Sequence, residues 1–152
     1  MVTKTLVVYY TRTGNTKKVA LEIAKTMNGD VCEIKSGRYP GLRGYFRAIF
    51  EAVFKRRPKI LIGKNPDNYD LIIIGTPNWG SRMASPVRSF IHNRKFDRVA
   101  FFCVQGGNGA EKIFKNMQKL TRRHIASVVV NDRDIESGDY MVKIKEFCRG
   151  LK

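Results

Sequence analysis

The chain has 152 residues, of which 43% are hydrophobic and 28% are charged. This length corresponds to about one domain, and this composition is typical of a globular protein and excludes an intrinsically disordered one. The 29 basic residues outnumber the 13 acidic ones, which gives a formal net charge of +16. Such a charge predicts attraction to an anionic partner without identifying it. The whole chain, residues 1–152, is expected to form a single domain, with no stretch that reaches the roughly 18 apolar residues of a membrane span.

The first third of the chain alternates between strand and helix patterns. The continuous apolar run Leu6–Tyr10 is typical of a strand buried on both faces of a parallel sheet. A helix is expected next, ending at Gly29, and Asp30–Lys35 predicts a short second strand. The apolar positions of that first helix are Val19, Ala20, Ile23, Ala24 and Met27. The strongest helical stripe in the chain follows and consists of Leu42, Tyr45, Phe46, Ile49, Phe50, Val53 and Phe54.

The remainder of the chain continues the alternation. Leu71–Ile74 is the most hydrophobic strand and is expected at the centre of the sheet. Ser85-Pro86 predicts a helix start, because serine is a good N-cap and proline suits the first helical position. The fourth and fifth strands are expected at Val99–Val104 and Val128–Val130. Helices marked by Ile113, Phe114, Met117 and Leu120, and by Tyr140, Ile144, Phe147, Cys148 and Leu151, complete the pattern.

Five strands alternating with five helices predict an α/β domain with a parallel sheet. In such sheets ligands bind beyond the carboxyl ends of the strands, so the loops after strands one, three and four are the places to look for a site. The three cysteines, Cys32, Cys103 and Cys148, are far apart in sequence and odd in number, which indicates buried free thiols in a reduced, cytoplasmic protein. No Ser/His/Asp set and no metal-binding cluster is recognisable, so neither catalytic residues nor a metal is expected.

The loop Thr11-Arg12-Thr13-Gly14-Asn15-Thr16 has the features of a phosphate site. Gly14 permits a tight turn, and the start of the following helix offers unpaired amides with a partial positive charge. Lys17 and Lys18 lie in the first helical turn, where the helix dipole disfavours cations unless an anion is bound. A plain helix cap at Thr13 is the alternative interpretation, because such turns are common before helices.

The loops after strands three and four also suit a ligand. Gly75-Thr76-Pro77-Asn78-Trp79-Gly80-Ser81 contains the only tryptophan, which could stack on a flat aromatic ligand or pack against its own domain. Gln105-Gly106-Gly107-Asn108-Gly109 contains three glycines in five residues, which would let backbone amides approach a ligand closely. A flexible connector between strand and helix is the alternative for this second loop.

Taken together, the three loops resemble those of the flavodoxin-like family. The family pattern Ser/Thr-x-Thr-Gly-x-Thr after strand one is filled at every patterned position by Thr11-x-Thr13-Gly14-x-Thr16. Trp79-Gly80 match the Trp-Gly pair that flavodoxins often carry against the isoalloxazine ring, and Gly106-Gly107 match the loop that bounds its pyrimidine side. The resemblance implies a doubly wound, five-stranded parallel sheet in the order 2-1-3-4-5, with helices on both faces and non-covalently bound FMN.

The resemblance also implies three groups of cofactor contacts. The 5′-phosphate would be held by Thr11, Arg12, Thr13, Gly14, Asn15 and Thr16. One side of the ring would be flanked by Thr76, Pro77, Asn78, Trp79 and Gly80, and the other by Gln105, Gly106, Gly107 and Asn108. The aromatic residue that usually stacks in the third loop is absent, which leaves Met83, Tyr10 or an aromatic of the second helix to cover the other face. If the Arg12 guanidinium reaches the phosphate, it adds a charge–charge contact.

Two redox roles follow from the resemblance, and a third reading comes from the charge. An electron carrier between partner proteins is preferred to a small FMN-dependent oxidoreductase that acts on a quinone or porphyrinogen-type acceptor. The carrier needs only an exposed ring edge, whereas the oxidoreductase needs a substrate pocket that a second subunit often completes, so both a monomer and a homodimer fit. The basic charge predicts acidic redox partners and a flavin potential less negative than in acidic flavodoxins, with Ser81 where that family often has aspartate.

The third interpretation is not a redox function: the chain would be a basic nucleic-acid-binding domain that holds no flavin. The clusters Lys55-Arg56-Arg57 and Arg122-Arg123-His124 would be its contact points. Neither cluster lies in a recognised nucleic-acid-binding motif, and most charge runs are simply solvated faces, so nucleic acid is not the expected partner.

Overall fold

In the computed structural model, which describes residues 2–37 and 39–152, five parallel strands form one sheet in the order β2-β1-β3-β4-β5. This confirms the predicted fold class and strand order. The strands are β1 (Thr5–Tyr9), β2 (Asp30–Glu33), β3 (Leu71–Pro77), β4 (Val99–Gln105) and β5 (His124–Asn131). The three central strands are almost wholly buried, because helices cover both faces of the sheet and both faces of these strands are therefore apolar.

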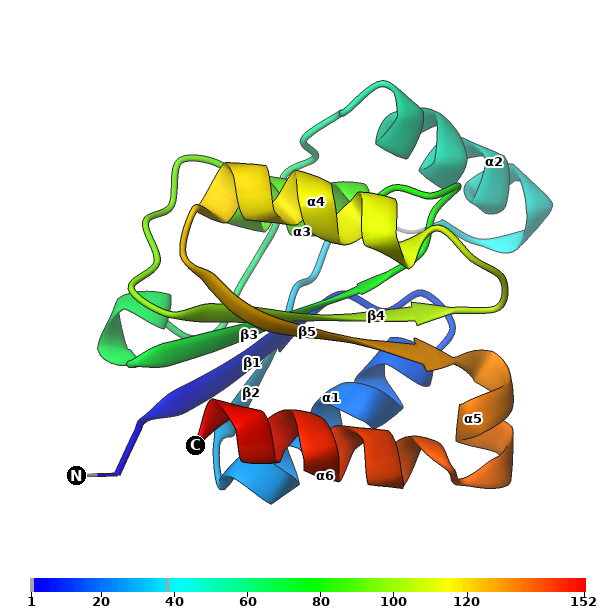
Figure 1. Cartoon of the computed structure of the whole chain (residues 1–152). Helices are drawn as coiled ribbons and strands as arrows, with labels where there is room; N and C mark the ends of the chain where they lie inside the picture. The colour runs from blue at the N-terminus through cyan, green and yellow to red at the C-terminus, as the bar shows by residue number, and fades with distance from the viewer. Residues whose placement is uncertain (1, 38) are drawn as a thin grey trace.

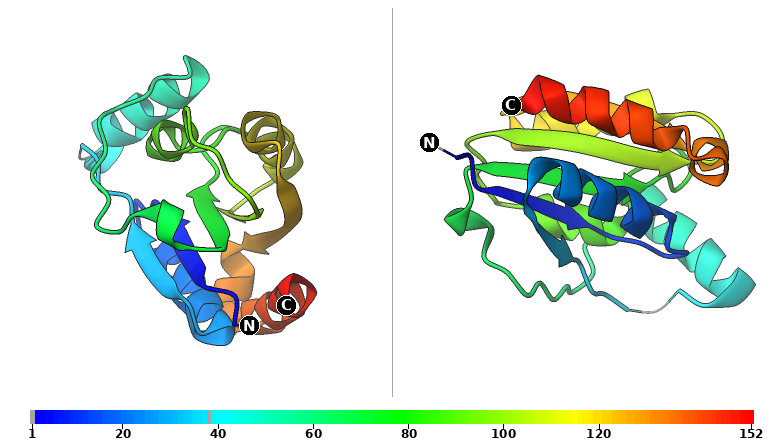
Figure 2. Two further views of the ribbon diagram at one scale, coloured as in Figure 1. Left: turned by 90° about the vertical axis from the view of Figure 1, so that its left-hand side faces the viewer. Right: turned by 90° about the horizontal axis from the view of Figure 1, so that it is seen from below.

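The helices form a layer on each side of the sheet (Figure 1). On one side lie α1 (Asn15–Met27) and α6 (Tyr140–Leu151), and on the other lie α3 (Ser85–Ile91) and α4 (Ala110–Thr121). The helix α2 (Gly41–Val53) lies outside α3 at the periphery of the molecule, as Figure 2 also shows. Two short elements complete the fold: a 3₁₀ turn at Pro66–Asn68 and the helix α5 (Asp132–Ser137).

The core consists of two hydrophobic layers separated by the sheet. Phe101 belongs to the layer under α3 and α4, and its neighbour Phe102 to the layer under α1 and α6, because successive side chains of a strand point to opposite faces. Gly75 on β3 makes room for Phe102, since a Cβ there would stand 1.9 Å from the Phe102 ring. Cys32 and Cys103 lie in the first layer and Cys148 in the second, and all three are free thiols, as expected.

The structure differs from the predicted elements mainly near the carboxyl-terminal end. β5 spans His124–Asn131, whereas only its apolar stretch Val128–Val130 was expected. This strand lies at the edge of the sheet and is half-buried over most of its length, so its flanks are not apolar enough to be recognised. The short helix α5 was not predicted, because none of its residues, all of which the structure describes, is buried and no apolar periodicity marks it.

The helix α2 turns its small residues inward and its large apolar residues outward. Gly44, Ala48 and Ala52 are buried against the rest of the protein. The helix approaches the preceding segment so closely that a Cβ at Gly44 would stand 2.0 Å from the Tyr39 carbonyl carbon. The aromatic stripe that marks this helix in the sequence is therefore left largely exposed to solvent.

Candidate functional site

The three predicted loops meet at the carboxyl edge of the sheet, around a hollow of about 250 Å³. Most of the lining comes from residues that the sequence singled out: Arg12, Thr13, Asn15, Thr16, Pro77, Asn78, Trp79, Gln105 and Gly106. Two further lining residues, Val104 and Asp132, were not predicted as site residues, and a third, Tyr45, is one of the aromatic residues of the second helix that were considered for the site. Of the predicted set, Thr11, Gly14, Thr76, Gly80, Gly107 and Asn108 lie in the same loops but outside this lining.

The first loop presents an open helix N-terminus to the hollow. Gly14 has a left-handed backbone with a φ of 104° and directly precedes α1, and no side chain within the described residues caps that helix. The Thr11 hydroxyl instead accepts a hydrogen bond from the Gly14 amide at 2.9 Å, which closes the turn. The cap is thus Gly14 and not Thr13, and the amides of the first helical turn stay free to bind an anion.

The Arg12 side chain points from this loop toward the start of α2. Its Nε donates to the Tyr39 carbonyl at 3.2 Å, and its Nη2 donates to the Gly41 carbonyl at 3.0 Å. The guanidinium also lies over the Tyr45 ring, 5.8 Å from its centroid. Arg12 therefore forms part of the wall of the hollow and fastens the α2 segment to the end of β1.

The second loop is a miniature hairpin. Asn78 pairs with Met83 in an antiparallel bridge, and Trp79 and Arg82 exchange backbone hydrogen bonds at 2.9 and 3.1 Å. The two residues at the tip, Gly80 and Ser81, have φ values of 59° and 61°, the backbone of a type I′ turn. The hairpin fixes the position of Trp79 relative to the sheet edge.

The base of this hairpin is held by a buried threonine. The Thr76 hydroxyl accepts a hydrogen bond from the Ala84 amide at 2.9 Å and donates to the Pro77 carbonyl at 2.8 Å. Thr76 thus acts on the site through the shape of the loop, and its side chain is inaccessible to solvent.

Trp79 borders the hollow with a ring that is otherwise packed in the core. The residue is only 5% exposed. Its ring meets those of Tyr10 and Tyr39 edge-on, with centroid distances of 5.5 and 5.2 Å. Burial raises the pKa of Tyr10 to about 12, so this phenol stays neutral beside the tryptophan at ordinary pH. Of the two roles considered for Trp79, packing within its own domain is the one that the structure displays.

Asn78 joins the second loop to the third. Its amide nitrogen Nδ2 donates to Gln105 Oε1 at 2.9 Å and to the Asn108 carbonyl at 2.8 Å. Its Oδ1 accepts from the Ser81 backbone amide at 2.7 Å. One side chain thereby sets the spacing between the two loops on either side of the hollow.

The third loop approaches the hairpin tip through a glycine. Gly109 has a φ of 106°, and a Cβ there would stand 2.3 Å from the Ser81 hydroxyl oxygen. Both the backbone conformation and the close contact therefore require glycine. Gly106, Gly107 and Asn108 are exposed at the mouth of the site.

Asp132 is an acidic residue at the site that the sequence analysis missed. It follows β5, and its Oδ1 accepts a hydrogen bond from Asn15 Nδ2 at 3.0 Å, which links the fifth strand to the first loop. Its Oδ2 would stand 2.9 Å from a Cβ at Gly106. The signal was available, because β5 ends at the same sheet edge as the other strands, but only the loops after strands one, three and four were considered.

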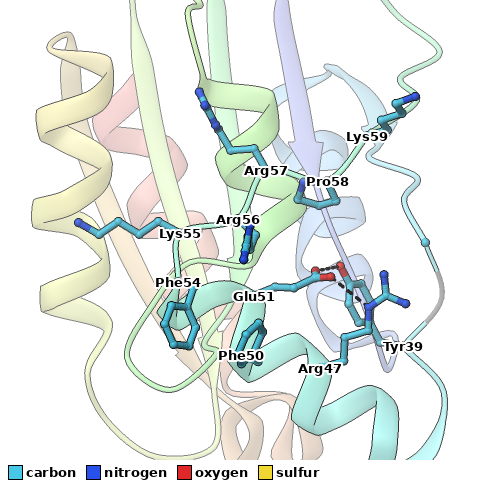
Figure 3. A pocket seen from close by; sticks show the side chains of 11 residues that line it. Tyr39, Arg47, Phe50, Glu51, Phe54, Lys55, Arg56, Arg57, Pro58 and Lys59 are labelled. Carbon is cyan, nitrogen blue, oxygen red and sulfur yellow. Dashed lines mark hydrogen bonds and ion pairs between the residues drawn. The ribbon is translucent and has the colours of Figure 1, made fainter.

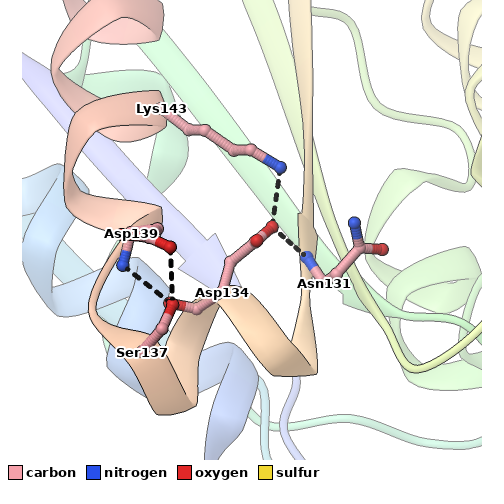
Figure 4. A network of polar contacts seen from close by, with 5 residues as sticks. All are labelled: Asn131, Asp134, Ser137, Asp139 and Lys143. Carbon is pink, nitrogen blue, oxygen red and sulfur yellow. Dashed lines mark hydrogen bonds and ion pairs between the residues drawn. The ribbon is translucent and has the colours of Figure 1, made fainter.

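The segment after Asp132 is fixed by a network of polar contacts (Figure 4). The Asp134 carboxylate accepts from the Asn131 amide at 3.2 Å and from Lys143 Nζ at 2.6 Å, and Asn131 and Asp134 form a capping box at the start of α5. The hydrogen bond from Lys143 is the main reason that the pKa of Asp134 lies below its usual value. This network holds the chain that carries Asp132 against α6.

Within residues 2–37 and 39–152 there is no group of three or more His, Cys, Asp or Glu side chains that could hold a metal ion. None of the helices in the described part of the chain is both long enough and apolar enough to span a membrane.

The chain is similar to known proteins in its structure. No protein-family model and no curated protein matches the sequence. A flavoprotein from Lactobacillus acidophilus, solved in complex with FMN, has a TM-score of 0.72 at 23% identity, over 89% of this chain and 97% of that one. Oxidised flavodoxin 2 from Bacillus cereus has a TM-score of 0.58 at 17% identity, over 97% of this chain and 96% of that one.

The likeness extends to an enzyme. An NAD(P)H:quinone oxidoreductase from Methanothermobacter marburgensis has a TM-score of 0.57 at 9% identity, over 99% of this chain and 98% of that one. Strand order, helical layers and these likenesses agree, and the chain has the flavodoxin-like fold.

Proposed function

We propose that this protein binds FMN non-covalently at the hollow and carries electrons between partner proteins. The observation that supports this most strongly is the open N-terminus of α1, which faces the same hollow as Trp79 on the second loop and Gln105 on the third. The Lactobacillus acidophilus protein of the same fold was solved with FMN. FMN would supply the redox chemistry, and the protein would bind, orient and tune it.

The residues present fit the phosphate of this cofactor. The first-turn amides of α1 and the hydroxyls of Thr13 and Thr16 would hold it, and the first turn contains no acidic residue to repel it. The Arg12 guanidinium donates hydrogen bonds to two backbone carbonyls. We therefore propose that it shapes the wall of the phosphate site and does not bind the phosphate directly. Thr11 and Gly14 would act by shaping the turn, through the hydrogen bond between them.

The ring would lie between the second and third loops, bordered by Trp79 on one side and by Gln105 and Gly106 on the other. Of the candidates for the second face, Met83 and Tyr10 are buried, whereas Tyr45 lines the hollow. We therefore assign that face to Tyr45. A hollow of about 250 Å³ is smaller than the roughly 300–1,000 Å³ of most ligand pockets. An edge of the ring would remain at the surface, which is what a carrier requires.

The charge of the chain supports acidic proteins as redox partners. A net charge of +16 would steer them to the surface and make electron transfer between them slow down as salt is added. It would also make the potential of bound FMN less negative than in acidic flavodoxins. A redox titration of the FMN-loaded protein checks this, and a potential as negative as theirs contradicts it. The free, buried cysteines agree with a reducing compartment such as the cytoplasm.

A second candidate is an FMN-dependent oxidoreductase acting on a quinone or porphyrinogen-type acceptor. It is favoured by the likeness to the quinone oxidoreductase of Methanothermobacter marburgensis. Catalytic reduction of a water-soluble quinone to the quinol by the FMN-loaded protein, with NAD(P)H as the two-electron donor, distinguishes this candidate from a carrier, which would need a partner protein to reduce its flavin.

Titration of flavin-free protein with FMN, followed by Trp79 fluorescence and flavin absorbance, tests the proposal. We expect quenching that saturates at one FMN per chain. Riboflavin, which lacks the phosphate, should bind roughly tenfold more weakly or worse, a difference of about 1.4 kcal/mol. Folded protein that takes up no FMN overturns the proposal, and equal affinity for riboflavin overturns the assignment of the phosphate site.

The contact with Trp79 needs a conservative variant, because this ring is also part of the core. The substitution Trp79→Ala would lower the free energy of unfolding by about 3–5 kcal/mol, because it leaves a cavity where the ring packs in the core. Trp79→Phe keeps an aromatic ring against Tyr10 and Tyr39 and shortens the edge that borders the hollow. We expect this variant to stay folded and to bind FMN more weakly, measured by flavin absorbance.

A further inference from the structure

The outer face of α2 carries a row of exposed apolar side chains, of which the proposed flavin site uses only Tyr45. Leu42, Phe46, Phe50 and Phe54 follow one another at four-residue spacing, and their exposed fractions are 74%, 63%, 52% and 61%. Tyr45 and Val53 on the same helix are also exposed. A contiguous apolar patch of this kind on a protein surface marks an interaction site. We call these six residues the α2 face.

Cations surround the α2 face. Arg43 and Arg47 lie on the helix itself, and the segment that leaves it contributes four exposed cations, Lys55, Arg56, Arg57 and Lys59. In Figure 3 the Lys55 and Lys59 side chains extend to opposite sides. The Arg57 guanidinium contacts the His92 ring. The single acidic residue between positions 42 and 59 is Glu51. Its carboxylate accepts hydrogen bonds from the Tyr39 hydroxyl and from Arg47 Nε at 3.1 Å, so it leaves most of the positive charge uncompensated.

We propose that the α2 face binds peripherally to the surface of an anionic lipid bilayer. A helix with Phe and Leu on one side and Lys and Arg around it lies in the plane of the interface, with its apolar side chains among the headgroups and its cations paired with lipid phosphates. Four to eight cations beside an apolar helix are the usual signature of anionic-lipid binding. The helix is 13 residues long and would rest on the bilayer without crossing it.

The position of α2 in the fold suits a flat partner. The helix lies at the periphery of the molecule in Figures 1 and 2. Gly44, Ala48 and Ala52 are buried against the body, whereas the apolar row is exposed. Arg12 fastens its first turn through the Tyr39 and Gly41 carbonyls. The α2 face is therefore presented outward on a helix that is itself anchored.

Charge argues against a second copy of the chain as the occupant. Two molecules would each bring a net charge of +16, and the same basic rim would meet itself across a symmetric contact. A bilayer containing anionic lipid removes that repulsion, because each cation near its surface gains attraction. Tyr45 belongs to the α2 face and also lines the hollow, so binding would bring the mouth of the hollow close to the lipid surface.

Flotation of the full chain with lipid vesicles tests the inference, and it is run on flavin-free and FMN-loaded protein. We expect binding to vesicles of phosphatidylglycerol mixed with phosphatidylcholine, weakened by added salt, and much weaker binding to phosphatidylcholine alone. Flavin-free protein should bind as well, so a failure of the flavin proposal and a failure of the lipid proposal give different results. No binding to the anionic vesicles at low salt overturns the inference.

Paired variants locate the contact. Phe46→Ser with Phe50→Ser should weaken binding by about tenfold or more, because two apolar side chains no longer enter the interface. Arg56→Gln with Arg57→Gln should weaken binding to anionic vesicles to a similar extent. All four positions are exposed, and circular dichroism confirms that the variants stay folded.

A matched pair on the opposite side of the sheet serves as the control. Lys145→Gln with Arg149→Gln on α6 removes the same charge from exposed positions and should change binding less than about twofold. An equal loss from this control would mean adsorption by net charge alone and would overturn the assignment to α2, as would full binding by the Phe46/Phe50 variant. Failure to bind vesicles together with a dimer that this variant abolishes would assign the face to a second copy.

Discussion

Replacement of Asn78 by alanine tests whether one side chain holds the two loops of the site together. The substitution removes the hydrogen bonds to Gln105 Oε1, to the Asn108 carbonyl and from the Ser81 amide, at 2.9, 2.8 and 2.7 Å. The Asn78 backbone bond to the Val104 carbonyl, at 3.0 Å, remains. The second and third loops then lose their side-chain connection but keep their place on the sheet.

The magnitude follows from the number and exposure of these bonds. A hydrogen bond contributes about 0.5–1.5 kcal/mol net to stability, so the loss of three has an upper bound of about 4.5 kcal/mol. The bond to Asn108 is exposed and the other two are partly buried, so water replaces much of what is lost. We expect a decrease of about 2 kcal/mol in the free energy of unfolding.

Urea unfolding followed by circular dichroism measures this decrease, which should lower the midpoint and leave the slope unchanged. Gln105→Ala is the matched control, since it removes only one of the three bonds and should cost about 1 kcal/mol or less. FMN binding to Asn78→Ala should weaken by roughly tenfold, because the loops must be ordered on binding. Equal stability of Asn78→Ala and Gln105→Ala would refute the view that Asn78 sets the spacing of the loops.

Three further substitutions address the turn, the charge at the site and the pH dependence. Gly109→Ala should destabilise the protein by more than about 1 kcal/mol in the same unfolding assay, because of the φ of 106° and the close Ser81 hydroxyl; adding Ser81→Gly should recover only part of this, and full recovery would mean that the backbone conformation costs nothing. Asp132→Asn keeps an acceptor for Asn15 and removes a negative charge beside the proposed phosphate site, so FMN should bind a few-fold more tightly at low salt, with a smaller gain at high salt; unchanged affinity would place the phosphate elsewhere. Asp134→Asn should lower stability most at neutral pH, because the hydrogen bond from Lys143 holds the pKa of Asp134 below its ordinary value in the folded protein. Its carboxylate therefore stabilises the fold above the pKa that it has in the unfolded chain, and this effect is lost as the pH falls through the lowered pKa. Unfolding measured from pH 7 to about pH 3 should show the two proteins converge in acid, and a constant difference would contradict the role of the charge.

Much of the fold could be predicted from the sequence, because the central strands and the helices beside them have apolar patterns of the correct period. The turn at Gly14 was predictable because a glycine stands between a strand pattern and a helix pattern. The meeting of the three loops was predictable because the carboxyl ends of parallel strands lie at the same edge of the sheet. The direction of the Arg12 side chain was not, because it depends on carbonyls at Tyr39 and Gly41 that are distant in sequence. The burial of Trp79 between two tyrosines likewise depends on tertiary packing.

The orientation of the helix α2 is a second feature that the sequence pattern does not determine. Its periodic aromatic residues identify a helix, but periodicity does not say which side faces the protein. The small residues decide this: a Cβ at Gly44 would meet the Tyr39 backbone, and Ala48 and Ala52 are buried on the same side of the helix. Asp132 was missed because the loop after the fifth strand was not among those expected to form the site, although that strand ends at the same edge of the sheet.

The three cysteines provide the protein with internal reporters of local opening. Cys32 lies on the edge strand β2, Cys103 on the central strand β4 and Cys148 on α6, and all are buried. Burial raises the pKa of Cys103 to about 12 and that of Cys148 to about 11, so neither thiol reacts until its surroundings open. The rates at which a thiol reagent modifies each sulfur would therefore rank the opening of the sheet edge, the sheet centre and the last helix in one native protein.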